Sequence, residues 1–363
     1  MLPRDNLNLA DTDALSAEID RLVGVETTES PFLSCYLDAR SGKDACKAFV
    51  EEAAASVRGA LEVVSRFEFD NAFNMVMDQL DGSLEPRVGG LALFARGIAG
   101  GRFVSALRFA TPVDNSLTWY RAPEIVPLLA LRERASRFTM LMVRGSGTQV
   151  MDVDLDGARP VVWAAFPPVS PPRTAARGCA ISLFDRQSRT IRRAIGARSG
   201  IPLVVAGDRE RVDRAVACLP GRVRARCVDG IALSDSLTEH DFLERVREHW
   251  VANRSLESTR FATRLLRVLR PQGNAVAGPV ATEQALREGN VETLVISEAP
   301  CEVPDRRWDA RIELSRLAWR QGIPIIASES SELQYLGGVG CVLRSRAGRR
   351  ILPVPANGLQ QVA

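Results

Sequence analysis

The chain has 363 residues, of which 46% are hydrophobic and 25% charged; this is typical of a folded protein of two or three domains and excludes wholesale disorder. Its seven cysteines are never spaced Cys-x-x-Cys and it has only two histidines, which argues against a disulfide framework, a structural zinc site and most histidine chemistry. No apolar run reaches the roughly 18–20 residues of a membrane span, and the N-terminus lacks a signal-peptide pattern. We therefore expect a cytoplasmic protein.

Basic and acidic residues are distributed unevenly along the chain. Residues 134–236 hold 17 basic residues against 9 acidic ones, whereas residues 1–133 are net acidic and residues 237–363 are nearly balanced. A strongly basic block between two others predicts a middle domain that meets a polyanion. We expect three α/β domains with these boundaries, each built on a mixed or parallel sheet with flanking helices.

The first segment predicts a helix over 13–23, a strand over 31–38 and one long helix over about 47–67. Two further strands at 89–95 and 101–107 flank a glycine-rich turn and predict a hairpin.

The middle segment opens with a strand at 138–143. A turn at Gly145-Ser146-Gly147 then leads into a second strand at 148–154. The turn lies in neither a GxxxxGK[ST] nor a GxGxxG context, so a hairpin is favoured over a phosphate loop. A short strand at 160–166 and a proline-rich loop at 167–178 follow. The remaining predicted elements are a basic helix to about 198, a buried parallel strand at 201–207 and a helix at 209–219 capped by Asp208.

The third segment begins with a capping-box pattern at 236–239, which opens a long helical stretch towards residue 270. Helices and strands then alternate, which predicts βαβ crossovers. The predicted helices lie at 280–288, 312–321 and 330–335, and the predicted strands at 293–297, 324–327 and 340–343.

A specific motif runs through the third segment. It consists of Gly278-x3-Thr282-x2-Ala285-Leu286-x2-Gly289 before the strand ending at Ser297, then Gln321-Gly322-Ile323-Pro324, then Leu336-Gly337-Gly338-Val339-Gly340-Cys341-Val342-Leu343-Arg344. This pattern resembles the C-terminal domain of archaeal and eukaryotic class-I peptide-chain release factors and Pelota. The middle and first segments resemble that family more loosely, and the whole chain is similar to the bacterial archaeo-eukaryotic release factor-like family. Gly289 is suited to a helix C-cap, and Gly337-Gly338 to a tight turn.

The sequence departs from the family at the loop that carries the chemistry. A release factor positions water against the peptidyl-tRNA ester with Gly-Gly-Gln, which occurs nowhere in this chain. The resemblance places Arg177-Gly178-Cys179 at that position. We therefore expect no peptide release, no catalytic residue and no cofactor or metal.

Other candidate residues each have a structural alternative. Cys179 beside Arg177 is either a nucleophile of lowered pKa or a small residue packing at a helix start, and the second is favoured because no histidine is near it in sequence. His240 and His249 are nine residues apart, which is not the spacing of a metal-ligand pair on a helix. Asp152 and Asp154 share one strand face and would either bind a cation or be solvated.

The basic stretch from 171 to 200 is the best functional signal. It has seven arginines against Asp185 alone, and Arg186, Arg189 and Arg193 recur on one helix face. Arginine forks bind phosphate, whereas the alternative is a solvated basic face. The predicted RNA-binding residues are Arg173, Arg177, Gly178, Arg186, Arg189, Arg192, Arg193 and Arg198.

We expect a ribosome-associated, Pelota-like protein without release catalysis, which binds the ribosomal A site in hibernation or rescue. Its partners would be rRNA or tRNA and, as the resemblance implies, a translational GTPase at the C-terminal domain. Two alternatives stay open: a tRNA-directed hydrolase or nuclease, and a stress-linked interaction protein that no longer binds ribosomes.

Overall fold

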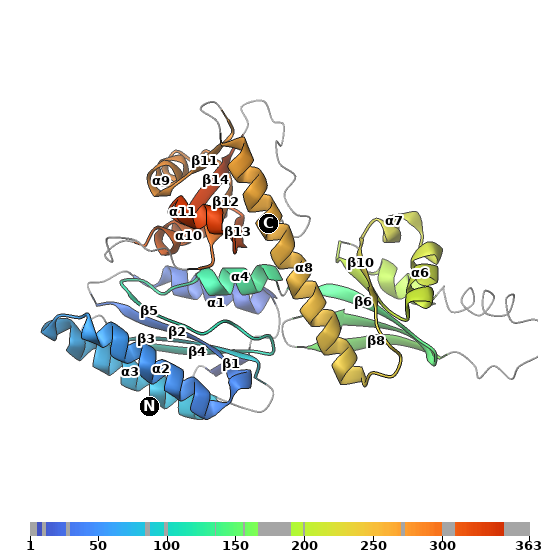
Figure 1. Cartoon of the computed structure of the whole chain (residues 1–363), viewed down its shortest axis with the longest axis horizontal. Coiled ribbons are helices and arrows are strands. Elements are labelled where there is room, and N and C mark those ends of the chain that lie inside the picture. Colours follow the sequence, from blue (N-terminus) through green and yellow to red (C-terminus); the bar gives the residue numbers. More distant parts are fainter. Residues whose placement is uncertain are drawn as a thin grey trace, which may run out of the picture. The chain divides into compact units, whose positions relative to one another are not determined.

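The computed structural model describes residues 6–8, 12–26, 30–83, 88–97, 101–134, 136–154, 157–165, 190–198, 200–269, 273–299 and 309–344. Three sheets with flanking helices give the mixed α/β class that the sequence predicts (Figure 1). The chain forms two compact units, one of residues 1–135 with 252–363 and one of residues 136–251. No helix in the described segments is long and apolar enough to cross a membrane.

The first sheet has the strand order β1-β4-β3-β2-β5. Its neighbouring strands are antiparallel except for β1 and β4, which are parallel. The strands are β1 (Asn6–Asn8), β2 (Phe32–Asp38), β3 (Gly90–Arg96), β4 (Phe103–Phe109) and β5 (Ser116–Tyr120). The predicted hairpin of β3 and β4 is confirmed, whereas the short strands β1 and β5 were not predicted.

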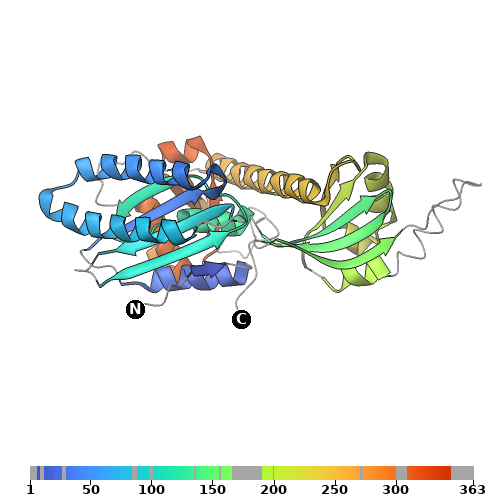
Figure 2. The ribbon, with the colours of Figure 1, turned by 90° about the horizontal axis from the view of Figure 1, so that it is seen from below.

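Helices cover both faces of this sheet, which is why β2 and β3 are buried at nearly every position. On one face lie α2 (Lys43–Gly59) and α3 (Val63–Ser83), and on the other α1 (Thr12–Gly24) and α4 (Val126–Arg134) (Figures 1 and 2). A short 3-10 turn, Ala39–Ser41, follows β2. The single long helix predicted over 47–67 is wrong, because α2 ends at Gly59 and a new helix starts at Val63.

The central unit carries the second sheet, with the strand order β10-β9-β6-β7-β8. The predicted hairpin at Gly145-Ser146 is confirmed, and β9 runs parallel to β6 as expected. Asp208 caps α6 by accepting a hydrogen bond from the Glu210 N–H, at 3.2 Å. The elements are β6 (Phe138–Arg144), β7 (Gly147–Val153), β8 (Ala158–Ala165), a helix at 190–196, β9 (Leu203–Gly207), α6 (Arg209–Cys218), α7 (Gly221–Arg224) and β10 (Cys227–Ala232).

Helix α8 (Glu239–Val268) contributes to the cores of both units. Phe242, Val246 and Trp250 pack with the central sheet, whereas the later part of the helix packs with the third sheet. The cap is Thr238, whose Oγ1 accepts from the Asp241 N–H at 3.1 Å, so the predicted capping box begins two residues too early. The predicted boundary at 236/237 lies just before this helix, and the three-domain division stays a prediction.

The third sheet has the strand order β11-β14-β12-β13. The crossover through α10 makes β12 and β13 parallel, as predicted, whereas β14 is antiparallel to β12 because α11 is a short turn rather than a full crossover. The elements are β11 (Ala275–Ala277), α9 (Pro279–Arg287), β12 (Val291–Ser297), α10 (Ala310–Arg320), β13 (Ile325–Ser328), α11 (Ser331–Tyr335) and β14 (Val339–Leu343).

The glycines of the third segment occupy the turns that the sequence predicts for them. Gly289 has φ +67° and follows Glu288, the C-cap of α9, and the N–H of Asn290 donates to the Ala285 carbonyl at 3.0 Å to close that helix end. Gly337 has φ +88°, and a Cβ there would lie 2.7 Å from the Pro279 Cδ, so conformation and space both require glycine.

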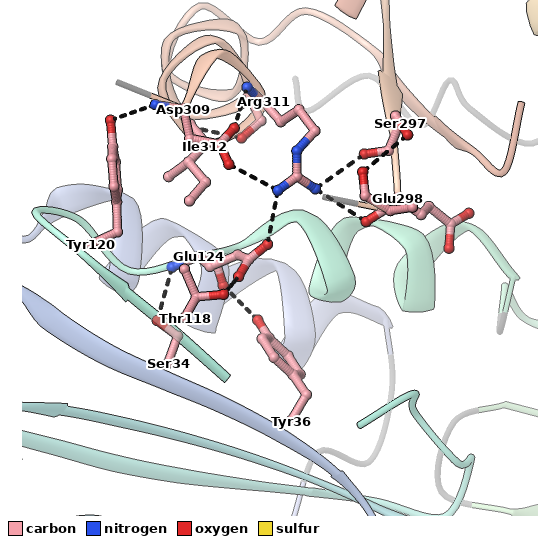
Figure 3. A network of polar contacts seen from close by, with 12 residues as sticks. Ser34, Tyr36, Thr118, Tyr120, Glu124, Ser297, Glu298, Asp309, Arg311 and Ile312 are labelled. Carbon is pink, nitrogen blue, oxygen red and sulfur yellow. Dashed lines mark hydrogen bonds and ion pairs between the residues drawn. The ribbon is translucent and has the colours of Figure 1, made fainter. Parts of the chain in front are cut away.

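A buried polar network joins the first and third sheets within their common unit (Figure 3). Arg311 of α10, only 2% exposed, lies 3.7 Å from the Glu124 carboxylate and 2.9 Å from that of Asp309. Glu124 also accepts from the Thr118 hydroxyl, and burial raises its pKa. Tyr120 donates to Glu313 at 2.9 Å. Separating the two sheets would leave these buried charged groups without partners. The network therefore holds the two sheets together.

A second contact closes the end of α1. The Arg316 guanidinium donates to the carbonyls of Leu22, Val23 and Val25, at 3.0 to 3.2 Å. The last carbonyls of a helix have no intrahelical donor and carry partial negative charge, so a buried cation is stabilised there. Burial, with neighbouring Arg320, lowers the pKa of Arg316 to about 10.

Candidate nucleic-acid interface

Five of the eight predicted RNA-binding residues lie outside the described residues, together with Cys179: Arg173, Arg177, Gly178, Arg186 and Arg189. The other three lie on or just after the helix at 190–196. Ile191 and Ile195 of this helix are buried in the core of the central sheet, and because they face inwards, Arg192 and Arg193 are exposed.

Arg198 has a different environment from its two neighbours. Its side chain is 19% exposed, and its Nε lies 2.7 Å from Asp152 on β7. A second nitrogen donates to the Ala194 carbonyl at 2.7 Å, so the residue fixes the end of the helix to the sheet. The side chain of Arg198 is therefore already engaged within the fold.

Asp152 and Asp154 are only 8% exposed, so the predicted solvated strand face is wrong. Asp152 pairs with Arg198 and Arg137, and Asp154 pairs with Arg159. Although burial raises the pKa of Asp152, the hydrogen bonds from Arg198 and Arg137 outweigh it and lower that pKa overall. These carboxylates neutralise arginines at the sheet, and no set of three potential metal ligands occurs in the part of the chain that the structure describes.

The structure brings in Arg224 and Arg226 from a separate segment of the chain, in which Arg222 is also exposed. Arg226 donates to the Ile195 carbonyl at 3.0 Å, and Arg224 donates to the Leu219 carbonyl at 3.3 Å. From the other side, Arg192 reaches the Cys218 carbonyl at 3.5 Å. Arginines of both segments therefore meet at the C-terminal ends of two helices, where unpaired carbonyls attract them.

Together with Arg193 and Arg222, which are exposed and close to them in the sequence, these residues form a positively charged surface, called here the arginine cluster. In the described segments none of its members forms an ion pair with a carboxylate, whereas Arg209, Arg211 and Arg214 of the neighbouring helix each do. The cluster consists of Arg192, Arg193, Arg222, Arg224 and Arg226. A surface of uncompensated guanidinium groups attracts phosphate.

The sequence contains a short pattern for the arginines of residues 222–226. Arg222, Arg224 and Arg226 alternate in the sequence, and each contributed to the charge of the basic block. Only the fold shows that Arg224 and Arg226 lie beside the helix at 190–196, because β9 and α6 separate the two segments in sequence.

Both histidines belong to the surface of the central unit. His249 lies 2.5 Å from Asp229, and His240 is exposed on the first turn of α8. The two are not brought together as metal ligands.

The C-terminal sheet carries an exposed apolar patch, defined by Val280, Tyr335 and Leu336. Their exposures are 78%, 91% and 41%, respectively. The start of α9 and the end of α11 meet there, since Pro279 lies against Gly337. Large apolar side chains gathered on two adjoining elements are typical of an interaction surface.

No protein-family model matches the chain, and no curated protein matches it in sequence. Among solved structures, an archaeal translation termination factor, aRF1, is 17% identical with a TM-score of 0.28, over 95% of this chain and all of that one. Pelota of Archaeoglobus fulgidus is 15% identical with a TM-score of 0.38, over 95% and 96% of the two chains. Dom34 of S. cerevisiae, a translation termination-like factor involved in RNA quality control and interacting with Hbs1, is 9% identical with a TM-score of 0.41, over 93% and 94%. All three TM-scores are below 0.5, so the whole chains superpose poorly.

Proposed function

We propose that this protein binds the ribosomal A site as a Pelota-like factor without release catalysis, in hibernation or rescue. The observation that carries the proposal is the arginine cluster on the central unit, which has no carboxylate partner among the described residues. The release-factor part of the proposal is supported by the sequence pattern of residues 278–344.

The cluster would contact rRNA or tRNA through phosphate. Arg193 and Arg222 are the most informative members, because both are exposed and neither side chain makes a hydrogen bond or ion pair with another described residue. Each phosphate that an arginine neutralises releases bound counterions, so affinity falls as salt rises.

The absence of Gly-Gly-Gln supports a role in occupancy rather than peptide release. Arg177-Gly178-Cys179 would keep one glycine and would place a bulky cation at the position of the other. We expect no hydrolysis above background when the purified chain meets ribosomes that carry labelled peptidyl-tRNA. Release that is lost in Cys179→Ala would instead support the alternative of a tRNA-directed hydrolase.

A translational GTPase is the partner proposed for the C-terminal domain. The apolar patch of Val280, Tyr335 and Leu336 supports this, because exposed apolar side chains gain most when a partner buries them. Tyr335→Ser would weaken the binding of such a partner without altering the affinity for RNA.

The RNA-binding proposal is tested with Arg193→Ala combined with Arg222→Ala. Binding to tRNA and to ribosomes is measured over a series of salt concentrations, and the slope of log K against log salt should fall by about 2. The control combines Arg214→Ala with Arg287→Ala, which removes the same charge from side chains that already pair with glutamates. An unchanged slope in the first variant would contradict the proposal.

A further inference from the structure

A shallow groove runs between α6 and the edge strand β10 of the central unit. One wall is a single face of α6, formed by Arg209, Val212, Asp213 and Val216 at helical spacing. β10 forms the other wall, and Arg224 of α7 also lines it. The groove has a volume of about 420 Å³ and is open to solvent.

Two features of β10 keep the groove open. The pairing of β10 with β9 shifts between Cys227 and Asp229, so Val228 is an extra, bulged residue, and it is 39% exposed. Gly230 has no side chain, and a Cβ there would lie 3.1 Å from the Val212 Cγ1.

Three of the four charged side chains that line the groove already have a polar side-chain partner among the described residues, and the fourth is Arg224. Asp213 is already paired with Arg209, and Asp229 with His249. Arg224 has no carboxylate partner among the described residues and belongs to the arginine cluster, so the groove continues that surface. A peptide strand added to β10 is disfavoured, because the bulge at Val228 interrupts the regular pattern of hydrogen-bonding groups.

We propose that this groove binds an unpaired RNA base. Its valines contact the face of the base, the guanidinium groups of Arg209 and Arg224 stack on it or bind its edge, and the arginine cluster holds the adjoining phosphates. Unpaired bases are recognised in this way by apolar and planar cationic groups. The inference rests on the proposed RNA binding and names the kind of RNA: single-stranded, with accessible bases.

The test separates bases from phosphates. The full chain is titrated with a single-stranded uridine decamer and with a decamer of ribose phosphates that lacks bases but has the same charge, at one salt concentration. We expect the uridine decamer to bind about fivefold to tenfold more tightly, the contribution of stacking one base.

Two neutral variants examine the groove itself. Gly230→Val fills it and Val228→Asn makes its wall polar, and both should reduce the ratio of the two affinities towards one while leaving the salt dependence unchanged. Because Val228 is partly exposed, Val228→Asn keeps the test valid if Gly230→Val fails to fold. The control is Val64→Asn, which replaces an 84% exposed valine of α3 and should behave as wild type.

The outcomes distinguish the two proposals. If both decamers bind equally, or if both groove variants keep the preference for bases, the groove inference is overturned while RNA binding stands. If neither decamer binds at any salt concentration, the proposed RNA binding fails and the groove inference fails with it.

Discussion

The carboxyl group of Glu298 makes the stability of the unit that holds the first and third sheets dependent on pH. Glu298 follows β12 and is 16% exposed, and it pairs with Arg134 of α4, which also lies 2.6 Å from Glu329. Burial, opposed by Arg134 and assisted by Glu329 and Glu133, raises the pKa of Glu298 from 4.5 to about 7. The folded state therefore favours the protonated acid.

The direction of the effect follows from this raised pKa. The stabilising contribution is fully present below the unfolded pKa of 4.5 and is lost as the pH rises through about 7. Between pH 5 and pH 8 the loss amounts to about 2–3 kcal/mol of the free energy of unfolding, at about 1.4 kcal/mol per pH unit over the interval between the two pKa values.

Glu298→Gln removes this titration while keeping the shape of the side chain. Urea unfolding followed by circular dichroism at pH 5 and pH 8 should show that the wild type loses about 2–3 kcal/mol more than the variant. Glu51→Gln, at an exposed glutamate of α2, should keep the wild-type pH dependence. If Glu298→Gln keeps it as well, the reasoning about this buried carboxyl is refuted.

Three further changes test the fold by urea unfolding. Arg316→Ala should cost about 2–4 kcal/mol, because it leaves the Leu22 and Val25 carbonyls at the end of α1 without their donor, while the Val23 carbonyl keeps Arg320; a loss below 0.5 kcal/mol would contradict that role. Gly337→Ala should be more destabilising than Gly289→Ala, since both have positive φ but only the first also meets Pro279; equal losses would contradict this. Thr238→Ala should lower the free energy of unfolding by about 1 kcal/mol, because α8 loses its N-cap. An unchanged free energy of unfolding would contradict the assignment of Thr238 as the cap.

Local patterns in the sequence predict most of the elements of this fold. The hairpin at Gly145-Ser146, the cap at Asp208 and the turns at Gly289 and Gly337 each depend on a few neighbouring residues. Elements that depend on distant partners were missed. β11 has only three residues, β10 is an edge strand interrupted by a bulge, and the antiparallel direction of β14 follows from how short α11 is.

The candidate site was predicted only in part, for the same reason. A run of arginines between 171 and 200 is visible in the sequence, but burial and pairing decide which of them reach solvent. Arg198 is bound to Asp152, whereas Arg224 and Arg226 join the surface from a segment separated by a strand and a helix. The polar network around Arg311 likewise joins residues almost 190 positions apart.

The central claim is that the chain occupies ribosomes through the positive surface of its central unit. The most direct measurement is co-sedimentation of the full chain with 70S ribosomes from stationary cells over a series of salt concentrations. We predict that the wild type pellets with ribosomes at low salt and is released as salt rises, and that Arg193→Ala with Arg222→Ala is released at lower salt. A wild-type chain that stays in the supernatant at every salt concentration would contradict the account.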